Sequence, residues 1–239
     1  SGRPPAPVAT RVKMPASDWI SFWDAKHSIY VDARHQAAHY RRIADDIRRM
    51  VPVGAVALEY GCGEAVSASQ VADAASRLIL CEAAPNVRAQ LAGRFGGNPK
   101  IVVRKPEDIS TMPSQSLDFI VMHSVAQYLS PTEFNSMIQL FRRLLKTDGT
   151  LVLGDIIPKR VSALGDALAL LRFGIREGFF WAALRGLFRT YFSDYWRLRN
   201  SLGLARYDEA EIVAKLETAG FSAQRARANI GHNARRMTF

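Results

Sequence analysis

Apolar and polar positions follow two rhythms along this chain. Five short runs are almost wholly apolar, at residues 55–60, 78–81, 101–103, 117–122 and 150–155. Between or before them lie segments with helical spacing, at residues 34–51, 66–76, 86–95 and 130–146. Buried strands that alternate with helices form a mostly parallel sheet covered on both faces. The pattern therefore predicts a Rossmann-like α/β fold.

Polar residues mark where several helices begin and end. Ser130, Pro131 and Glu133 combine a capping hydroxyl, a first-turn proline and a carboxylate that can reach back to the cap amide. Gly149 is expected to end that helix in a left-handed turn. A further helix is predicted from Asp208 to Ala219, with Asp208 and Glu211 as a capping pair and Gly220 as its stop.

The remaining residues complete the predicted architecture. Residues 221–229 and 234–239 are expected to form a terminal antiparallel hairpin, which brings the sheet to seven strands. Residues 158–206 are far longer than an ordinary connection and predict a helical insertion after the fifth strand, divided near Gly174 and Gly178. The 239 residues fit one domain at 17–239, and the proline-rich residues 1–16 are expected to be a flexible tail.

Two carboxylates flank a glycine-rich turn at the expected ligand-binding edge of the sheet. Glu59 precedes Gly61 and Gly63 at the end of the first strand, and Glu82 closes the second strand. Ligands bind such sheets at the carboxyl ends of the strands, where glycines let the backbone approach closely. A dinucleotide would need a third glycine where Val66 stands, so a cationic ligand without phosphate is favoured.

At these residues the chain resembles the class I S-adenosylmethionine-dependent methyltransferases, whose first motif reads roughly acidic-x-Gly-x-Gly-x-Gly. The resemblance runs from about Val56 to Phe239. It also includes Glu82, residues 106–108, residues 118–121 and residues 144–153. Two departures are Ala65 at the third glycine position and Lys105 where the family often has an acid.

The resemblance implies a set of contacts with S-adenosyl-L-methionine, the product being S-adenosyl-L-homocysteine. Glu59, Gly61 and Gly63 would line the methionine moiety, and Glu82 would bind the ribose. Glu107 and Asp108 would lie at the adenine edge. The expected cofactor site is completed by Cys62, Ala83, His123 and Tyr30, with Cys62 as a small packed residue and Tyr30 as part of an N-terminal segment that closes over the cofactor.

Three side chains are candidate bases for methyl transfer. His123 follows the fourth strand, Asp155 ends the fifth, and His232 lies in the turn of the predicted hairpin. A base is needed only where the acceptor is a hydroxyl or a protonated amine, since alignment of the reacting atoms can carry most of the rate. Each residue also has a purely structural interpretation. Cysteines and histidines show no metal-ligand spacing, and no metal is expected.

Charge and aromatic residues concentrate in the insertion. The chain carries a net charge of +10, yet residues 57–157 hold nine basic and ten acidic residues. Residues 158–206 hold nine of the 23 aromatics and nine Lys or Arg against three acids. The insertion could be a packed helical cap, the wall of a hydrophobic acceptor pocket, or a basic amphipathic surface resting on an anionic membrane.

These observations predict methyl transfer to O, N or C of a hydrophobic or amphipathic small molecule, with lipid-linked molecules among the candidates. The alternative is a non-catalytic domain whose basic face binds RNA or membrane. Nucleic acid is the less favoured partner, because the expected catalytic edge is nearly neutral and lacks an Asp/Asn-Pro-Pro-aromatic motif. Two cysteines make no disulfide framework, so a cytoplasmic protein is expected, with peripheral membrane contact left open.

Overall fold

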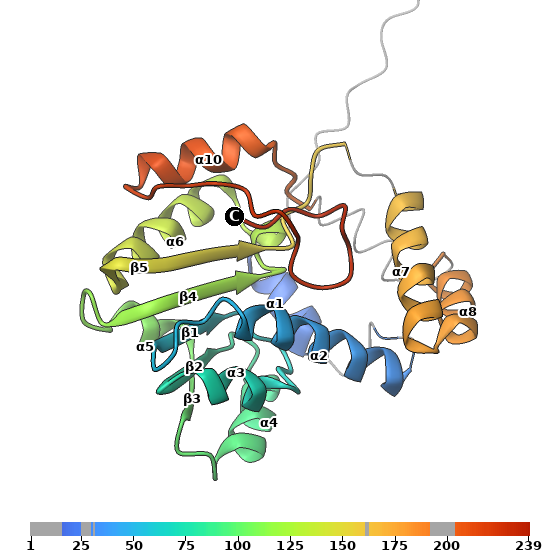
Figure 1. The fold of residues 1–239 in the computed structure, drawn as a ribbon, viewed down its shortest axis with the longest axis horizontal. Coiled ribbons are helices and arrows are strands. Elements are labelled where there is room, and N and C mark those ends of the chain that lie inside the picture. The colour runs from blue at the N-terminus through green and yellow to red at the C-terminus, as the bar shows by residue number, and fades with distance from the viewer. Residues whose placement is uncertain (1–15, 25–29, 31, 161–162, 192–203) are drawn as a thin grey trace, which may run out of the picture.

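The computed structural model describes residues 16–24, 30, 32–160, 163–191 and 204–239. They form an α/β domain around a five-stranded parallel sheet with the order β3-β2-β1-β4-β5 (Figure 1). The strands are β1 (Val56–Tyr60), β2 (Arg77–Cys81), β3 (Ile101–Arg104), β4 (Leu117–His123) and β5 (Leu145–Gly154). The strand order reverses between β1 and β4, and such a reversal is where ligands bind in open α/β sheets.

Helices cover both faces of the sheet. One face packs on α2 (Ala33–Arg48), α3 (Ala68–Ala74) and α4 (Pro85–Phe95). The other packs on α5 (Pro106–Ser110), α6 (Pro131–Leu144) and α10 (Glu209–Thr218). Because both faces are covered, the central strands are apolar at nearly every position, as the sequence pattern predicted.

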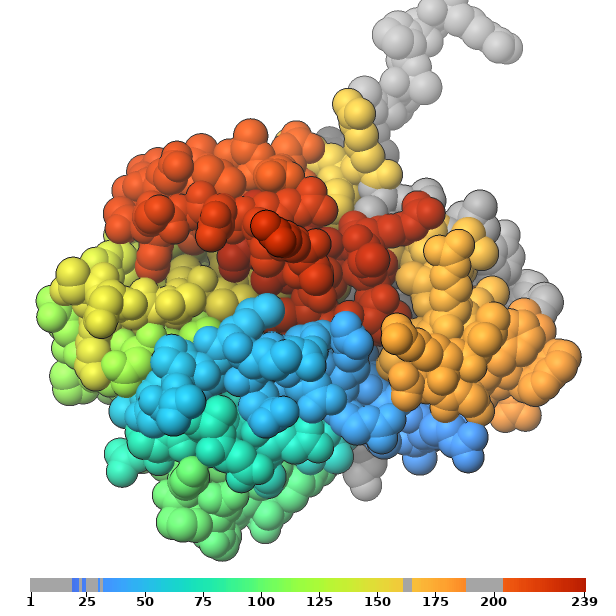
Figure 2. All heavy atoms as spheres, in the orientation of Figure 1, coloured from blue at the N-terminus to red at the C-terminus, as the bar shows by residue number. Residues whose placement is uncertain are grey.

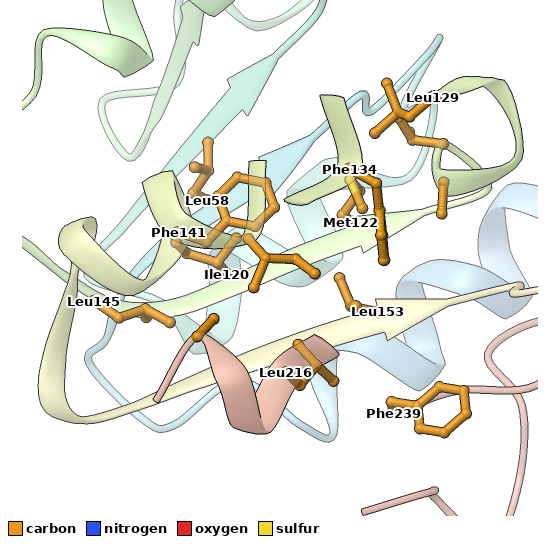
Figure 3. Packing of buried hydrophobic residues seen from close by; sticks show 14 of the residues in the cluster. Leu58, Ile120, Met122, Leu129, Phe134, Phe141, Leu145, Leu153, Leu216 and Phe239 are labelled. Atoms are coloured by element: carbon orange, nitrogen blue, oxygen red, sulfur yellow. The ribbon is translucent and has the colours of Figure 1, made fainter. Parts of the chain in front are cut away.

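The core beneath α6 is built from large side chains with almost no exposure. Phe141 of α6 lies beside Leu58 of β1 and Ile120 of β4, and Phe134 lies beside Met122 of β4 (Figure 3). The capping residues at the start of α6 are as predicted. Ser130 Oγ accepts a bond of 3.2 Å from the Glu133 amide, and the Glu133 carboxylate accepts one of 2.6 Å from the Ser130 amide.

The predicted seven-stranded sheet with a terminal hairpin is wrong, since the described residues contain the five parallel strands alone. Residues 234–239 do run antiparallel to the end of β5, where Leu153 exchanges backbone hydrogen bonds with Phe239 and Ile156 with Met237. The other arm, 221–229, contains mostly small and charged residues, which pack poorly in a sheet. Asn229 and Thr238 satisfy backbone groups here in place of a ladder.

Two predictions about helix ends are also wrong. Helix α6 ends at Leu144 and passes directly into β5, so Gly149 lies inside a strand and not in a left-handed turn. Asp208 precedes α10 but makes no capping hydrogen bond, and its carboxylate binds Lys159 together with that of Glu211. The distant lysine competes with the local cap, which a pattern of neighbours along the chain does not reveal.

The insertion after β5 contains two packed helices, α7 (Ala163–Glu177) and α8 (Phe180–Tyr191), which form a hairpin beyond the carboxyl edge of the sheet (Figure 1). Gly178, with φ of 78°, separates the two helices as predicted. Gly174 lies within α7, where a Cβ would come within 3.1 Å of both Ala183 and Phe180. Residues 192–203 lie outside the described residues.

Helix α1 (Ala16–Asp24) was not predicted, and residues 1–15 of the expected tail lie outside the described residues. Asp24 accepts hydrogen bonds from the backbone amide (2.6 Å) and side-chain amide (2.9 Å) of Asn86 at the start of α4. Helix α1 therefore lies across the carboxyl edge of the sheet. Over the described ranges, no helix combines the length and apolarity that a membrane span requires.

Replacing Ser130 by Ala should lower the free energy of unfolding by about 1 kcal/mol, because the first turn of α6 loses its capping acceptor. Urea unfolding monitored by circular dichroism measures this difference. Ser114→Ala, at an exposed loop serine, is the matched control and should leave the midpoint unchanged. Equal midpoints for the two variants would contradict the role of the cap.

Candidate functional site

A cavity of about 1420 Å³ lies at the carboxyl edge of the sheet. Residues from α1, α2 and α6, and from the segments that follow all five strands, line it. Of the residues predicted for the site, the lining includes Tyr30, Glu59, Gly61, Cys62, Gly63, Glu82, Ala83, Glu107, His123 and Asp155. Asp108 and His232 are not among the lining residues. The topology thus brings most of the predicted set to one place.

The glycine turn after β1 is required by packing as much as by a ligand. Gly61 and Gly63 have φ of 71° and 57°, values that favour glycine. A Cβ on Gly61 would overlap Cγ2 of Val125, which follows β4, and one on Gly63 would lie 3.3 Å from the Tyr40 hydroxyl. Ala65, at the third glycine position, also has a positive φ, of 38°.

Glu82 holds this turn against the end of β2. One carboxylate oxygen accepts a hydrogen bond of 2.8 Å from the Gly63 amide, and the other accepts one of 2.8 Å from the Ala84 amide. Burial raises the pKa of Glu82, while these backbone amides oppose the rise. From the other side, the Tyr40 hydroxyl accepts a bond of 3.2 Å from the Glu64 amide. The turn is therefore fixed before any ligand binds.

Glu59 lies in the same cavity wall, but its carboxylate, unlike that of Glu82, accepts no hydrogen bond from the described residues. Its side chain is buried, at 8% exposure. Burial raises its pKa from 4.5 to about 7. An unpaired carboxylate in an apolar wall is stabilised by a cationic ligand, which would restore its ordinary ionisation.

The two acids after β3 separate in the structure. Glu107 faces the cavity. The Asp108 carboxylate instead accepts a hydrogen bond of 3.3 Å from the Lys105 amide at the start of α5. Asp108 therefore serves the local helix end, and of the predicted adenine-edge pair Glu107 is the one that faces the cavity.

A chain of hydrogen bonds joins the ends of β4 and β5. The Ser124 hydroxyl donates to Asp155 Oδ2 over 2.7 Å and lies 3.1 Å from Nδ1 of His123, whose Nε2 lies 3.4 Å from the Ile230 carbonyl. Ser124 and Asp155 have φ of 57° and 59°, a strained conformation for residues other than glycine. Burial lowers the pKa of His123, and Asp155 and the Ile230 carbonyl oppose this.

Arg236 pairs with acidic residues of both the helical insertion and the end of β5, a contact that the sequence did not predict. Its Nη2 donates to Asp166 of α7 over 2.9 Å, and its Nε lies 4.0 Å from Asp155 Oδ1. The side chain is only 9% exposed. One guanidinium thus connects α7 to the carboxyl end of β5. In the sequence, the only signal for this contact is the pair of adjacent arginines, Arg235 and Arg236, near the C-terminus.

His232 belongs to an aromatic cluster between the insertion and α2. It stacks on Phe173 with ring centres 4.5 Å apart, and its ring lies 5.9 Å from that of His39. His35 stacks in the same way on Phe179 at 4.8 Å, and burial, followed by His232, lowers its pKa to about 4. The described geometry thus gives His232 a packing role in this cluster, beside His39 of the cavity lining.

A group of aromatic and aliphatic side chains also lines the cavity. Trp19 and Trp23 of α1 contact Tyr128, with ring centres 5.7 Å and 6.2 Å away. Met137 and Leu140 of α6 line the same cavity. Sequence patterning assigned no role to α1, although Trp19 and Trp23 are spaced four residues apart on one helical face. From the insertion, Leu204 lines the cavity, whereas no described residue of α7 or α8 does.

No group of three or more histidine, cysteine or acidic side chains in the described ranges is arranged to hold a metal ion. Both cysteines, Cys62 and Cys81, are buried free thiols. Burial raises the pKa of the Cys62 thiol well above its ordinary value, which agrees with a packed residue and not a nucleophile.

Residues 58–153 match a family described as a methyltransferase domain. DhpI, solved as a complex with SAH, is 14% identical, with 93% of this chain and 94% of that one covered and a TM-score of 0.59. The YcgJ protein of Bacillus subtilis is 16% identical over 79% and 71%, with a TM-score of 0.56. A SAM-dependent methyltransferase of Aquifex aeolicus is 15% identical over 95% and 96%, at 0.53. No curated protein matches the sequence.

The buried Glu59 should make the unliganded chain less stable as the pH rises. Its pKa is about 7 in the folded chain, against an ordinary 4.5, so the folded state keeps a proton that the unfolded state releases. Its contribution to stability, complete below about pH 4.5, is lost through about pH 7, and the full loss is about 3 kcal/mol.

Urea unfolding at a series of pH values, compared with Glu59→Gln, measures this contribution. The difference between the two proteins isolates Glu59, because the buried histidines act equally in both. The variant should lose this part of the pH dependence. Parallel curves for the two proteins would show that Glu59 titrates normally.

Proposed function

We propose that this chain is a class I S-adenosylmethionine-dependent methyltransferase, and that it methylates O, N or C of a hydrophobic or amphipathic small molecule. The match of residues 58–153 to a methyltransferase domain supports this proposal. The observation that carries the proposal is a single cavity whose lining combines acids that end or follow β1, β2 and β3 with aromatic and aliphatic side chains of α1, α6 and the segment after β4. Its volume of about 1420 Å³ exceeds the range of roughly 300–1,000 Å³ typical of single-ligand pockets. A methyltransferase needs this additional room, because the methyl acceptor binds beside the cofactor.

The acids of the cavity lining fit S-adenosylmethionine. Glu59, which has no other partner among the described residues, would face the cationic methionyl end. Glu82 uses one lone pair of each oxygen on a backbone amide, so each oxygen has a second lone pair for a ribose hydroxyl. Glu107 would lie at the adenine edge. Because the turn is already fixed, binding would require little ordering of the backbone.

When bound, the cofactor supplies an electrophilic methyl group on sulfur. The protein then has to hold the acceptor in line with it and exclude water. The ends of β1 and β4 are neighbours in the sheet, so residues 123–125 lie beside the glycine turn. An acceptor seated against α1 and α6 would therefore be presented from the β4 side.

His123 is the proposed base for an acceptor that loses a proton. With the Ser124 hydroxyl donating to Asp155, a neutral imidazole can donate to Ser124 or to the Ile230 carbonyl, but not to both. A protonated imidazole can donate to both. Uptake of a proton by His123 therefore adds a hydrogen bond. It also creates a positive charge that only the Ser124 hydroxyl separates from the Asp155 carboxylate in this series of hydrogen bonds. His232 has no part in this proposal.

The aromatic and aliphatic side chains of the lining indicate the acceptor class. Trp19, Trp23 and Tyr128 offer flat apolar surfaces, and Met137 and Leu140 offer aliphatic ones. Such walls bind rings or alkyl chains by burial of apolar area. A lipid-linked or otherwise amphipathic acceptor fits this description. Acceptors of that kind partition into bilayers, so the proposal includes a peripheral position at a membrane surface.

Calorimetry with S-adenosylmethionine and S-adenosylhomocysteine tests the cofactor site. Glu82→Gln should weaken binding of both about tenfold or more, because bonds to a charged acceptor are lost. Asp108→Asn is the matched control and should bind like the unaltered protein, since Asp108 lies outside the cavity lining. A folded chain that binds neither ligand would overturn the proposed function, and an unaltered affinity in Glu82→Gln would remove Glu82 from the site.

The acceptor site is tested separately with a panel of water-soluble aromatic and alkyl alcohols, phenols and amines, by measuring S-adenosylhomocysteine formation. For the best acceptor, Trp23→Ala should raise KM about tenfold through lost apolar contact while the S-adenosylhomocysteine affinity stays the same. Trp181→Ala, at an exposed tryptophan of α8, serves as control and should change neither. A change in cofactor affinity alone would place Trp23 beside the cofactor instead.

A further inference from the structure

The outward side of the α7–α8 hairpin exposes an unusual amount of apolar surface. Six large hydrophobic side chains are exposed in the part of the chain that the structure describes, and three of them lie on this hairpin. They are Leu168 (41% exposed), Ile175 (66%) and Trp181 (78%). Figure 2 shows the hairpin as a lobe at one end of the molecule, beside α2 and the C-terminal segment. The two most exposed residues flank the connection between its helices.

The acidic residues of the hairpin are paired with residues of the rest of the domain. The acidic residues of segment 163–191 are Asp166 and Glu177. Asp166 accepts hydrogen bonds from Arg236 and Asn233, each of 2.9 Å, and Glu177 pairs with Arg41 of α2 at 3.1 Å. Both acids therefore face the body of the domain and are neutralised there.

The arginines of the hairpin differ from its acids in both exposure and pairing. Arg172, Arg176 and Arg185 are exposed, and none of the ion pairs among the described residues involves them. The outward side consequently combines uncompensated positive charge with exposed aliphatic and aromatic groups.

The two helices share part of one arrangement of residue types. Leu168, Arg172, Ile175 and Arg176 follow the spacing i, i+4, i+7, i+8 in α7. In α8, Trp181 and Arg185 repeat the first two positions of this spacing, an apolar residue and then Arg. Positions at this spacing share one face of a helix.

We infer that this hairpin face, defined by Leu168, Arg172, Ile175, Arg176, Trp181 and Arg185, docks on an anionic lipid bilayer. Arginines meet the phosphate groups of the lipids, the tryptophan lies at the level of the headgroups, and the aliphatic side chains reach the acyl boundary. An RNA backbone would use the arginines, but it would leave Leu168 and Ile175 exposed to water. The aliphatic component thus favours lipid.

The position of the hairpin suits the proposed chemistry. It lies beyond the carboxyl edge of the sheet, the edge that holds the cavity (Figure 1). Docking through this face directs that edge of the domain toward the bilayer, where an amphipathic acceptor would reside. The inference rests on the proposed function for its biological meaning, although the surface itself is argued from its own residues.

Sedimentation of the full chain with vesicles tests the inference. Vesicles of phosphatidylcholine with phosphatidylglycerol should bind the chain at least about tenfold more tightly than pure phosphatidylcholine vesicles, and added salt should weaken the binding. The double variant Arg176→Glu and Arg185→Glu should lose about tenfold or more. Trp181→Ser should lose affinity in high salt as well, because its contribution is apolar.

Matched controls lie at the opposite, amino edge of the strands. Arg77→Glu removes an exposed arginine, and Val53→Ser removes the side chain that is 97% exposed. Both should bind vesicles normally. Equal binding to neutral and anionic vesicles, equal losses in controls and hairpin variants, or preference for single-stranded RNA over vesicles would each overturn the inference.

S-adenosylmethionine affinity in solution, measured on the same variants, separates this inference from the proposed function. It should stay constant across the hairpin variants and also reports that they are folded. Intact cofactor binding without vesicle binding overturns the docking surface alone. Vesicle binding by a chain that binds no cofactor overturns the proposed function and leaves the docking surface standing.

Discussion

The candidate site depends on one buried carboxylate whose two oxygens are each held by a backbone amide. Through Glu82, the end of β2 is tied to the turn after β1, so two neighbouring strands fix the shape of the loop between them. The same turn is closed from the β4 side by Val125, for which a side chain on Gly61 would leave no space. Contacts within the protein therefore fix this loop, and no bound ligand is required to hold it.

Against this rigid loop, Glu59 is the one strand-end acid left without compensation in the described structure. Glu82 offsets its desolvation with two hydrogen bonds, whereas Glu59 is buried with none. Two acids at adjacent strand ends thus have different tasks: one organises backbone, and the other stores an unfavourable electrostatic energy that a cation relieves. Such a pair distinguishes a binding site from an ordinary strand-to-helix turn.

The features that could be predicted from the sequence are those that short stretches of chain determine. The five apolar runs and the glycine turn follow from local patterning, and the parallel order of strands brings their ends together. The prediction of a hairpin at 221–239 was wrong because residues 221–229 are mostly small and charged, and because Asn229 and Thr238 bond to each other and to the backbone in place of a ladder. Helix α1 and the contact between Arg236 and Asp166 depend on partners far away in sequence, and no spacing rule reports those.

The buried guanidinium of Arg236 has a mechanical consequence for the molecule. It joins α7 to the carboxyl end of β5, and the stacked rings of His232 and Phe173 lie beside this joint. Swinging the hairpin outward would separate a desolvated ion pair and expose stacked rings, both of which are unfavourable. The position of the hairpin and the surroundings of Asp155, which accepts the Ser124 hydrogen bond, therefore depend on the same guanidinium.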